Sequence, residues 1–111
     1  MAKTLEDCQK FVDVYNKMFD EGKKQFDFNI ELKDGRVIER IFKVRDFKIG
    51  LNKEKKVNIL VKEENKYIEE ENAPFCPCKV EHIEGNICPC KDCLDEAEEK
   101  GRCHCLMYVK I

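Results

Sequence analysis

The cysteines in the last third of this chain constrain its fold and chemistry more than any other feature. Seven of the eight cysteines fall between positions 76 and 105, as Cys-Pro-Cys, Cys-Pro-Cys-x-x-Cys and Cys-His-Cys. A structural zinc ion or a four-iron cluster takes four protein ligands. The pattern therefore holds more sulfur than one such site needs, and the surplus requires its own explanation.

The composition indicates which partners and which cellular compartment these cysteines have. The chain has 111 residues, which is the size of one domain, and its net charge of -2 gives no general attraction to nucleic acid. It contains no apolar run of membrane-spanning length, and its first residues lack the apolar region of a signal peptide. We therefore expect a cytoplasmic protein. In a reducing compartment, clustered cysteines indicate metal binding or redox catalysis rather than structural disulfides.

The first part of the chain predicts a helix over residues 4–21. Thr4 is a candidate N-cap with Asp7 three residues later, and Gly22 ends the segment. Apolar side chains recur at three- and four-residue steps along it. Cys8 lies on that face, which predicts a buried core thiol. The residues of the face are Leu5, Cys8, Val12, Tyr15 and Phe19.

A β-hairpin is expected next. Residues 25–32 alternate apolar and polar side chains, Asp34-Gly35 is a strong turn signal, and residues 37–44 return as a second strand. A lone hairpin is unstable in water, so this one must lie on a helix or on another sheet.

Two further helices are expected around the first cysteine pair. Residues 53–71 show helical periodicity after a possible cap at Asn52, with Glu64 interrupting the apolar face, and residues 72–74 stop the helix. Residues 92–100 form a second helical stretch that ends at Gly101. The longer helix should bury Val57, Leu60, Val61 and Ile68.

Zinc is the first candidate for the cysteine region. Cys90-x-x-Cys93 is a normal zinc half-site, which Cys103 with His104 or Cys105 could complete. Such a site leaves three cysteines without a role: Cys76, Cys78 and Cys88.

An iron–sulfur cluster is the second candidate. A four-iron cluster takes four thiolates, and two of the surplus sulfurs could form a disulfide beside it. In an extended Cys-x-Cys segment the two side chains point to opposite sides, so one sulfur can face the cluster while its neighbour faces elsewhere. A turn could bring both sulfurs to one side, so geometry alone does not decide which cysteine does what.

The three motifs in this order resemble the catalytic chain of ferredoxin–thioredoxin reductase. The similarity includes the lead-in Ala73-Pro74-Phe75 and the helical stretch from Leu51 to Glu71, and it covers residues 51–109. It implies a redox-active disulfide between Cys78 and Cys105. It also implies four ligands of a 4Fe-4S cluster: Cys76, Cys88, Cys90 and Cys103.

The resemblance also implies roles in turnover. Cys78 would be the thiol that attacks the target disulfide, Cys105 would stay close to the cluster, and His104 would help with proton transfer. Attack requires an accessible thiol of depressed pKa, which His104 or His82 could tune. The simpler interpretation of His82 is a histidine in a surface loop without a role in the reaction.

The expected function is an iron–sulfur disulfide reductase. It would pass electrons singly from a ferredoxin-like donor through the cluster and the adjacent disulfide to the disulfide of a thioredoxin- or glutaredoxin-like protein. Two alternatives stay open. One is an electron-transfer or redox-sensor protein that carries the cluster without reductase activity, and the other is a zinc-stabilised binding module.

The chain departs from the family in several places. The gap between the Cys-Pro-Cys motifs is nine residues, shorter than in plant-type members, and the gap before Cys-His-Cys is twelve, which is longer. Cys93 is extra, and we favour a spare thiol over an alternative ligand or a second resolving thiol. In the plant system a separate small β-barrel chain partners the catalytic chain, so a second subunit is one option here.

These expectations combine into one architecture. The fold should be mainly α within an α+β class, with helices surrounding an iron–sulfur cluster and with an N-terminal helix and a β-hairpin. Residues 1–50 would form the helix-and-hairpin extension, which matches nothing recognisable. Residues 51–111 would form the catalytic-chain-like domain.

Overall fold

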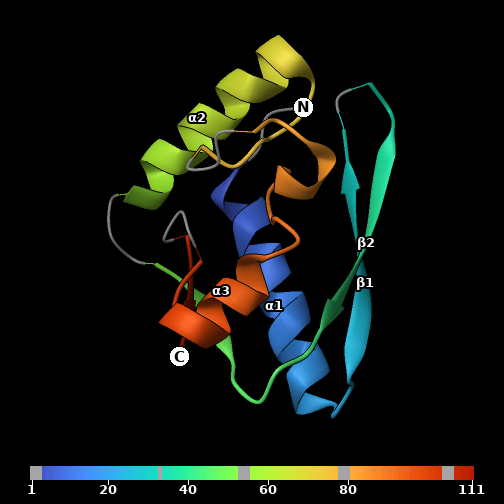
Figure 1. Ribbon diagram of the computed structural model, residues 1–111, viewed down its shortest axis with the longest axis vertical. Helices are drawn as coiled ribbons and strands as arrows, with labels where there is room; N and C mark the ends of the chain where they lie inside the picture. The colour runs from blue at the N-terminus through green and yellow to red at the C-terminus, as the bar shows by residue number, and fades with distance from the viewer. Residues whose placement is uncertain (1–3, 33, 53–55, 78–80, 104–106) are drawn as a thin grey trace.

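The computed structural model shows an α+β fold. It describes residues 4–32, 34–52, 56–77, 81–103 and 107–111, and within these ranges it contains three α-helices, one turn of 3-10 helix and two two-stranded antiparallel sheets (Figure 1). The elements in chain order are α1 (Leu5–Asp20), β1 (Gln25–Glu31), β2 (Val37–Lys43), β3 (Ile49–Leu51), α2 (Lys56–Glu71), η1 (Glu84–Asn86), α3 (Cys93–Lys100) and β4 (Tyr108–Lys110).

Helix α1 confirms the first predicted element. Thr4 caps it through a capping box, in which the Thr4 side chain accepts from the Asp7 N–H and the Asp7 carboxylate accepts from the Thr4 N–H. Cys8, Val12 and Tyr15 are buried as expected. At the two ends of this face, Leu5 is 43% exposed and Phe19 is half-buried, so only the middle of the face is fully covered.

The hairpin is also confirmed. Strands β1 and β2 pair antiparallel from Gln25 opposite Lys43 to Glu31 opposite Val37, and Gly35 takes a positive φ of 91° in the turn. Figure 1 shows the hairpin at one edge of the molecule, with the three α-helices together on the same side of the hairpin. The alternation along β2 buries Ile38, Arg40 and Phe42.

Helices α2 and α3 lie within the predicted stretches 53–71 and 92–100, and residues 53–55, where the first was expected to begin, lie outside the described residues. All four apolar residues predicted to share a face of α2 are buried, and the helix ends before residues 72–74. Gly101 caps α3 in the left-handed conformation, as its sequence position indicated. The buried α2 side chains are Val57, Leu60, Val61 and Ile68.

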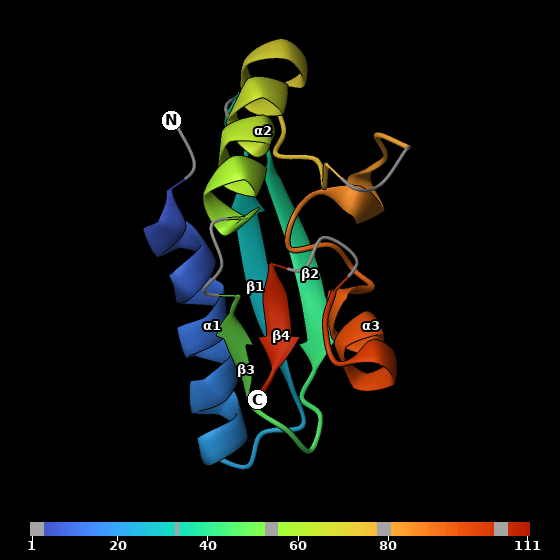
Figure 2. The ribbon, with the colours of Figure 1, turned by 90° about the vertical axis from the view of Figure 1, so that its left-hand side faces the viewer.

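A second small sheet was not predicted from the sequence. Strand β3 pairs antiparallel with β4, and Figure 2 shows this sheet between α1 and α3. Each strand is three residues long, which is too short to leave a periodic pattern in the sequence. The pairing joins segments that lie far apart in the chain.

The larger of the two buried clusters contains side chains from residues 1–50 and from residues 51–111. From residues 1–50 it takes the aromatic side chains Phe11, Tyr15 and Phe42, and from residues 51–111 it takes five cysteines and Tyr108. Phe11 lies at the centre, with ring centroids 5.0–5.1 Å from Phe28, Phe42 and Tyr108. The hairpin and α1 therefore pack directly against the cysteine region.

No helix among the described residues combines the length and apolar composition that a membrane crossing requires.

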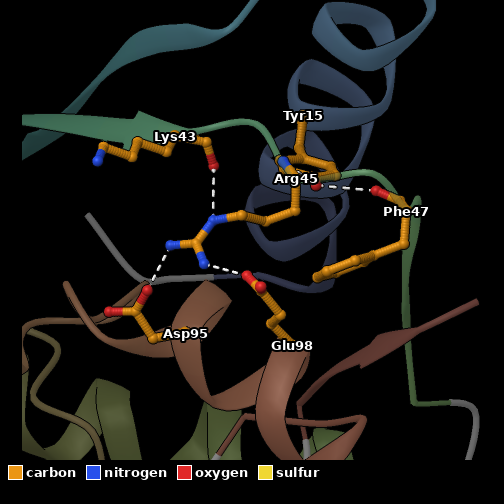
Figure 3. Close-up of polar contacts among 6 residues, drawn as sticks. All are labelled: Tyr15, Lys43, Arg45, Phe47, Asp95 and Glu98. Carbon is orange, nitrogen blue, oxygen red and sulfur yellow. Dashed lines mark hydrogen bonds and ion pairs between the residues drawn. The ribbon is translucent and has the colours of Figure 1, made fainter.

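The loop between β2 and β3 makes hydrogen bonds with α1 and ion pairs with α3. The buried Tyr15 hydroxyl donates to the Phe47 carbonyl at 2.8 Å and accepts from the Arg45 N–H at 3.0 Å. The Arg45 guanidinium reaches the carboxylates of Asp95 and Glu98 on α3 (Figure 3). These contacts link α1 to α3 through a connecting loop.

Replacing Tyr15 with Phe tests the importance of this link. Two backbone groups would lose a buried partner, so the free energy of unfolding should fall by about 1–3 kcal/mol. Urea unfolding measures the change. Tyr67→Phe is the matched control, because Tyr67 is only partly buried and makes an edge-on ring contact with His82. Equal stability of Tyr15→Phe and the wild type would contradict the assigned role.

Candidate functional site

Three of the predicted site residues lie outside the described residues. These are the proposed attacking thiol Cys78, the proposed proton-transfer residue His104 and the proposed resolving thiol Cys105. Their predicted roles stay predictions. The site is therefore built from the four predicted ligands, from Cys93 and from the groups that hold them.

The five described cysteines of the motifs are buried in one cluster. Their exposed fractions lie between 1% and 8%, and they share the core with Phe11 and Tyr108. The Sγ atom of Cys88 lies 3.9 Å from the Sδ atom of Met107. The cysteines are Cys76, Cys88, Cys90, Cys93 and Cys103.

A short antiparallel pairing brings the two Cys-Pro-Cys motifs side by side. Phe75 and Ile87 form an isolated β-bridge. On either side of it, the Cys76 N–H donates to the Asn86 carbonyl at 2.8 Å and the Cys88 N–H donates to the Pro74 carbonyl at 2.9 Å. Backbone hydrogen bonds therefore set the positions of Cys76 and Cys88 relative to each other.

Two further local contacts place the remaining sulfurs. The Cys93 N–H donates to the Cys90 carbonyl at 3.1 Å where α3 begins, and the peptide bond between Cys88 and Pro89 is cis. The Cys103 N–H donates to the Tyr108 carbonyl at 2.9 Å, and the Tyr108 N–H points back at the Cys103 Sγ at 3.3 Å. Hydrogen bonds of this N–H···S kind tune thiolate-held iron centres.

Cys76 is disulfide-bonded in this structure. The other described cysteines of the motifs, and Cys8, are not part of a disulfide. A sulfur cannot be half of a disulfide and a thiolate ligand at once, so ligation by Cys76 would need this sulfur as a thiolate.

The cysteines of the motifs supply the donor chemistry for a thiolate-bound metal centre, but the described ones do not form a closed coordination shell. Within the described ranges, no three His, Cys, Asp or Glu side chains are grouped closely enough to hold a metal ion. The thiols are nevertheless near enough to influence one another. Burial raises the pKa of the Cys93 thiol well above its usual value, and the neighbouring sulfurs of Cys90 and Cys103 raise it further.

Arg40 is a site residue that the sequence analysis missed. It belongs to β2, is 8% exposed and donates to three backbone carbonyls of residues 84–89. Its signal was present in the alternation of the strand, since Arg40 falls between the inward-facing Ile38 and Phe42. An arginine on the buried face of a strand needs dedicated partners, which here are the segment carrying Cys88.

Glu64 and His82 are two further polar groups near the cysteines. Glu64, which interrupts the predicted apolar face of α2, is completely buried, and its charge contributes to the raised pKa of Tyr108 after the larger effect of burial. His82 lies in a surface loop, as the simpler interpretation of the sequence held, and its ring makes two specific contacts there. Its Nδ1 lies 2.8 Å from a carboxylate oxygen of Glu71, and its ring stacks on Phe75 at 4.8 Å and 7°.

A cavity of about 650 Å³ connects the surface to this region. It runs from the N-terminal turn of α1, along β1, to Cys88, Pro89 and Tyr108. Its lining includes the charged side chains of Asp7 and Lys10 as well as apolar side chains. Part of the second Cys-Pro-Cys motif therefore lies against this cavity.

Comparison of the chain with models of known families, with curated proteins and with solved structures gave no match. The functional argument therefore depends on the sequence motifs and on the geometry described above.

The burial of Cys93 makes a prediction about its reactivity. A thiol that is 1% exposed and has a raised pKa stays neutral and can be alkylated only after local opening. Iodoacetamide should therefore label Cys93 in the native protein at least about 100-fold more slowly than a free thiol. Mass spectrometry of timed samples measures the rate, with the fully buried Cys8 as internal control. Rapid labelling of Cys93 alone would instead support a second resolving thiol.

Proposed function

We propose that this protein is an iron–sulfur disulfide reductase. It would take electrons one at a time from a ferredoxin-like donor and reduce the disulfide of a thioredoxin- or glutaredoxin-like protein. Cys78 and Cys105 would form the redox-active disulfide. The proposed ligands of a 4Fe-4S cluster are Cys76, Cys88, Cys90 and Cys103.

The observation that carries this proposal is the pairing of the two Cys-Pro-Cys motifs. Residues 74–76 and 86–88 exchange backbone hydrogen bonds around the Phe75–Ile87 bridge, and Cys103 belongs to the same buried cluster. All four proposed ligands are therefore gathered in one apolar environment. Such burial controls solvent access and reduction potential at thiolate-held centres.

A 4Fe-4S cluster would need Cys76 as a thiolate, whereas Cys76 is disulfide-bonded in this structure. Rearrangement of the sulfurs would therefore accompany cluster assembly, as it does when metal binding and folding are coupled.

The chain's own residues divide the thiol chemistry between them. Cys78, as a thiolate, attacks one sulfur of the partner's disulfide, and the partner's second sulfur leaves as a thiolate. Cys105, also as a thiolate, attacks the Cys78 sulfur of this mixed disulfide, which re-forms the Cys78–Cys105 bond and frees the partner. His104 would assist the accompanying proton transfers. Each turnover consumes two electrons and two protons and yields two partner thiols.

When bound, a 4Fe-4S cluster supplies one-electron chemistry beside a bond whose opening takes two electrons. Cys103 is prepared for a thiolate role, because the Tyr108 N–H already points at its sulfur. The apolar surroundings formed by Phe11, Met107 and Tyr108 keep water away from the described sulfurs.

A second candidate function follows from the spacing of Cys90-x-x-Cys93. These two cysteines share one buried cluster with Cys88 and Cys103, and four cysteines that include a Cys-x-x-Cys pair are a normal donor set for structural zinc. The chain would then be a zinc-stabilised binding module.

Metal content separates the two candidates. Protein purified without oxygen should be brown and contain about four irons per chain, because zinc sites are colourless. Elemental analysis and the visible spectrum measure this directly. One zinc per chain in place of iron would refute the reductase and support the binding module.

Two serine substitutions test the proposed division of labour. Cys78→Ser should keep the iron content within about 20% of wild type, since Cys78 is not a proposed ligand, yet reduce turnover at least about 1000-fold, since the nucleophile is lost. Cys76→Ser should instead lose most of the iron. Iron analysis and a coupled assay with a thioredoxin-like substrate measure both. Loss of the cluster from Cys78→Ser would show that the ligand assignment is wrong, and unchanged turnover would leave an electron-transfer or sensor protein.

A further inference from the structure

Arg40 connects the N-terminal hairpin to the second Cys-Pro-Cys motif. Its Nη1 donates to the carbonyl of Ile87 at 2.7 Å and also to the carbonyl of Pro89. Its Nη2 donates to the carbonyl of Glu84 at 2.7 Å. One side chain from β2 therefore holds the backbone on both sides of Cys88.

The shape of the guanidinium suits this task. It presents several N–H donors in a rigid planar fork, whereas a lysine ammonium is a compact point charge on a flexible stem. Three carbonyls that belong to one tight segment can be satisfied by such a fork without adjustment of the segment. Removing the fork would leave two buried acceptors, the carbonyls of Ile87 and Pro89, to find new partners, and Cys88 would lose its support on both sides.

The charge of Arg40 is a second contribution, separate from its hydrogen bonds. Carbonyl oxygens satisfy its donors but carry no net charge. Burial lowers the pKa of Arg40 from its usual value, and the nearby sulfurs of Cys90 and Cys93, with smaller effects from Glu84 and Cys88, act in the opposite direction. Because Arg40 is bonded to the carbonyls of Ile87 and Pro89, which flank Cys88, its charge lies next to the place where thiolate ligands would bring negative charge.

We propose that Arg40 is the positioning and charge-compensating residue of the second Cys-Pro-Cys motif, holding Cys88 and Cys90 for a thiolate-bound metal centre and stabilising the negative charge that this centre carries. The part that concerns reduction potential rests on the proposed function. The part that concerns metal binding does not, because any thiolate-bound metal would need the same support.

The expected direction of the electrostatic effect follows from charge alone. A thiolate-bound iron centre becomes more negative when it takes up an electron, and a buried cation nearby stabilises that reduced form. Removing the cation should therefore make reduction less favourable and move the midpoint potential to more negative values.

Three variants of the full-length protein separate charge from shape. Arg40→Gln removes the charge and the fork, and Arg40→Lys keeps the charge but loses the fork. Arg36→Gln is the matched control, because Arg36 lies in the turn of the same hairpin, exposed and paired with Asp34. The readouts are the midpoint potential of the cluster from a redox titration, and the affinity of the reduced, metal-free chain for Co²⁺ from its thiolate charge-transfer absorption.

The variants should differ as follows. Arg40→Gln should make cluster reduction at least about tenfold less favourable, which is about 59 mV for one electron, and should weaken Co²⁺ binding at least about tenfold, in line with the loss of a supporting contact at a metal site. Arg40→Lys should weaken Co²⁺ binding similarly but keep the potential close to wild type. Arg36→Gln should change neither quantity.

The outcomes distinguish failure of this inference from failure of the proposed function. A wild-type chain that carries a cluster, together with an Arg40→Gln variant of unchanged potential and unchanged Co²⁺ affinity, overturns the inference and leaves the reductase standing. If the wild-type chain holds no iron, and Arg40→Gln lowers the affinity for Co²⁺, the reductase proposal is overturned and the inference about Arg40 stands. If Arg40→Gln does not fold, a folded Arg40→Lys with wild-type Co²⁺ affinity overturns the positioning role. A wild-type chain that binds neither metal overturns both.

Discussion

The hydrogen bonds between residues 74–76 and 86–88 are the contact on which the rest of the cysteine region depends. They fix two Cys-Pro-Cys motifs beside each other although nine residues separate them. Few helices or strands surround this contact, so its stability depends on side chains from other parts of the chain. Arg40 holds one of its two segments from the hairpin, and the aromatic core beneath it comes largely from α1 and β1–β2. The N-terminal half of the chain thus acts as the platform on which the sulfurs are arranged.

The sequence predicted the elements whose signals are local. Thr4 and Gly101 mark helix ends by their own chemistry, and Asp34-Gly35 marks a turn, so α1, α3 and the hairpin could be located to within a few residues. The β3–β4 sheet could not be found, because a three-residue strand has no detectable period and its partner lies more than fifty residues away. Long-range pairing of that kind is decided by tertiary packing.

The candidate site divides in the same way. The cysteines were identified by their spacing. The structure buries Cys76, Cys88, Cys90 and Cys103 in one cluster, but within the described residues no three such side chains are grouped closely enough to hold a metal ion. Arg40 was missed because a charged residue in an alternating strand looks like an ordinary surface residue unless its neighbours show which face is buried. The state of Cys76 was also beyond sequence reasoning, since the choice between thiolate ligand and disulfide depends on redox conditions and not on residue type.

The pairing of β3 with β4 has a consequence for how the protein is made. Residues 108–110 close the sheet begun by residues 49–51, and Tyr108 supplies both backbone contacts to Cys103. During translation α1 and the hairpin are made well before this strand. The surroundings of Cys103 are therefore complete only after residues 108–110 have been synthesised and have paired with residues 49–51.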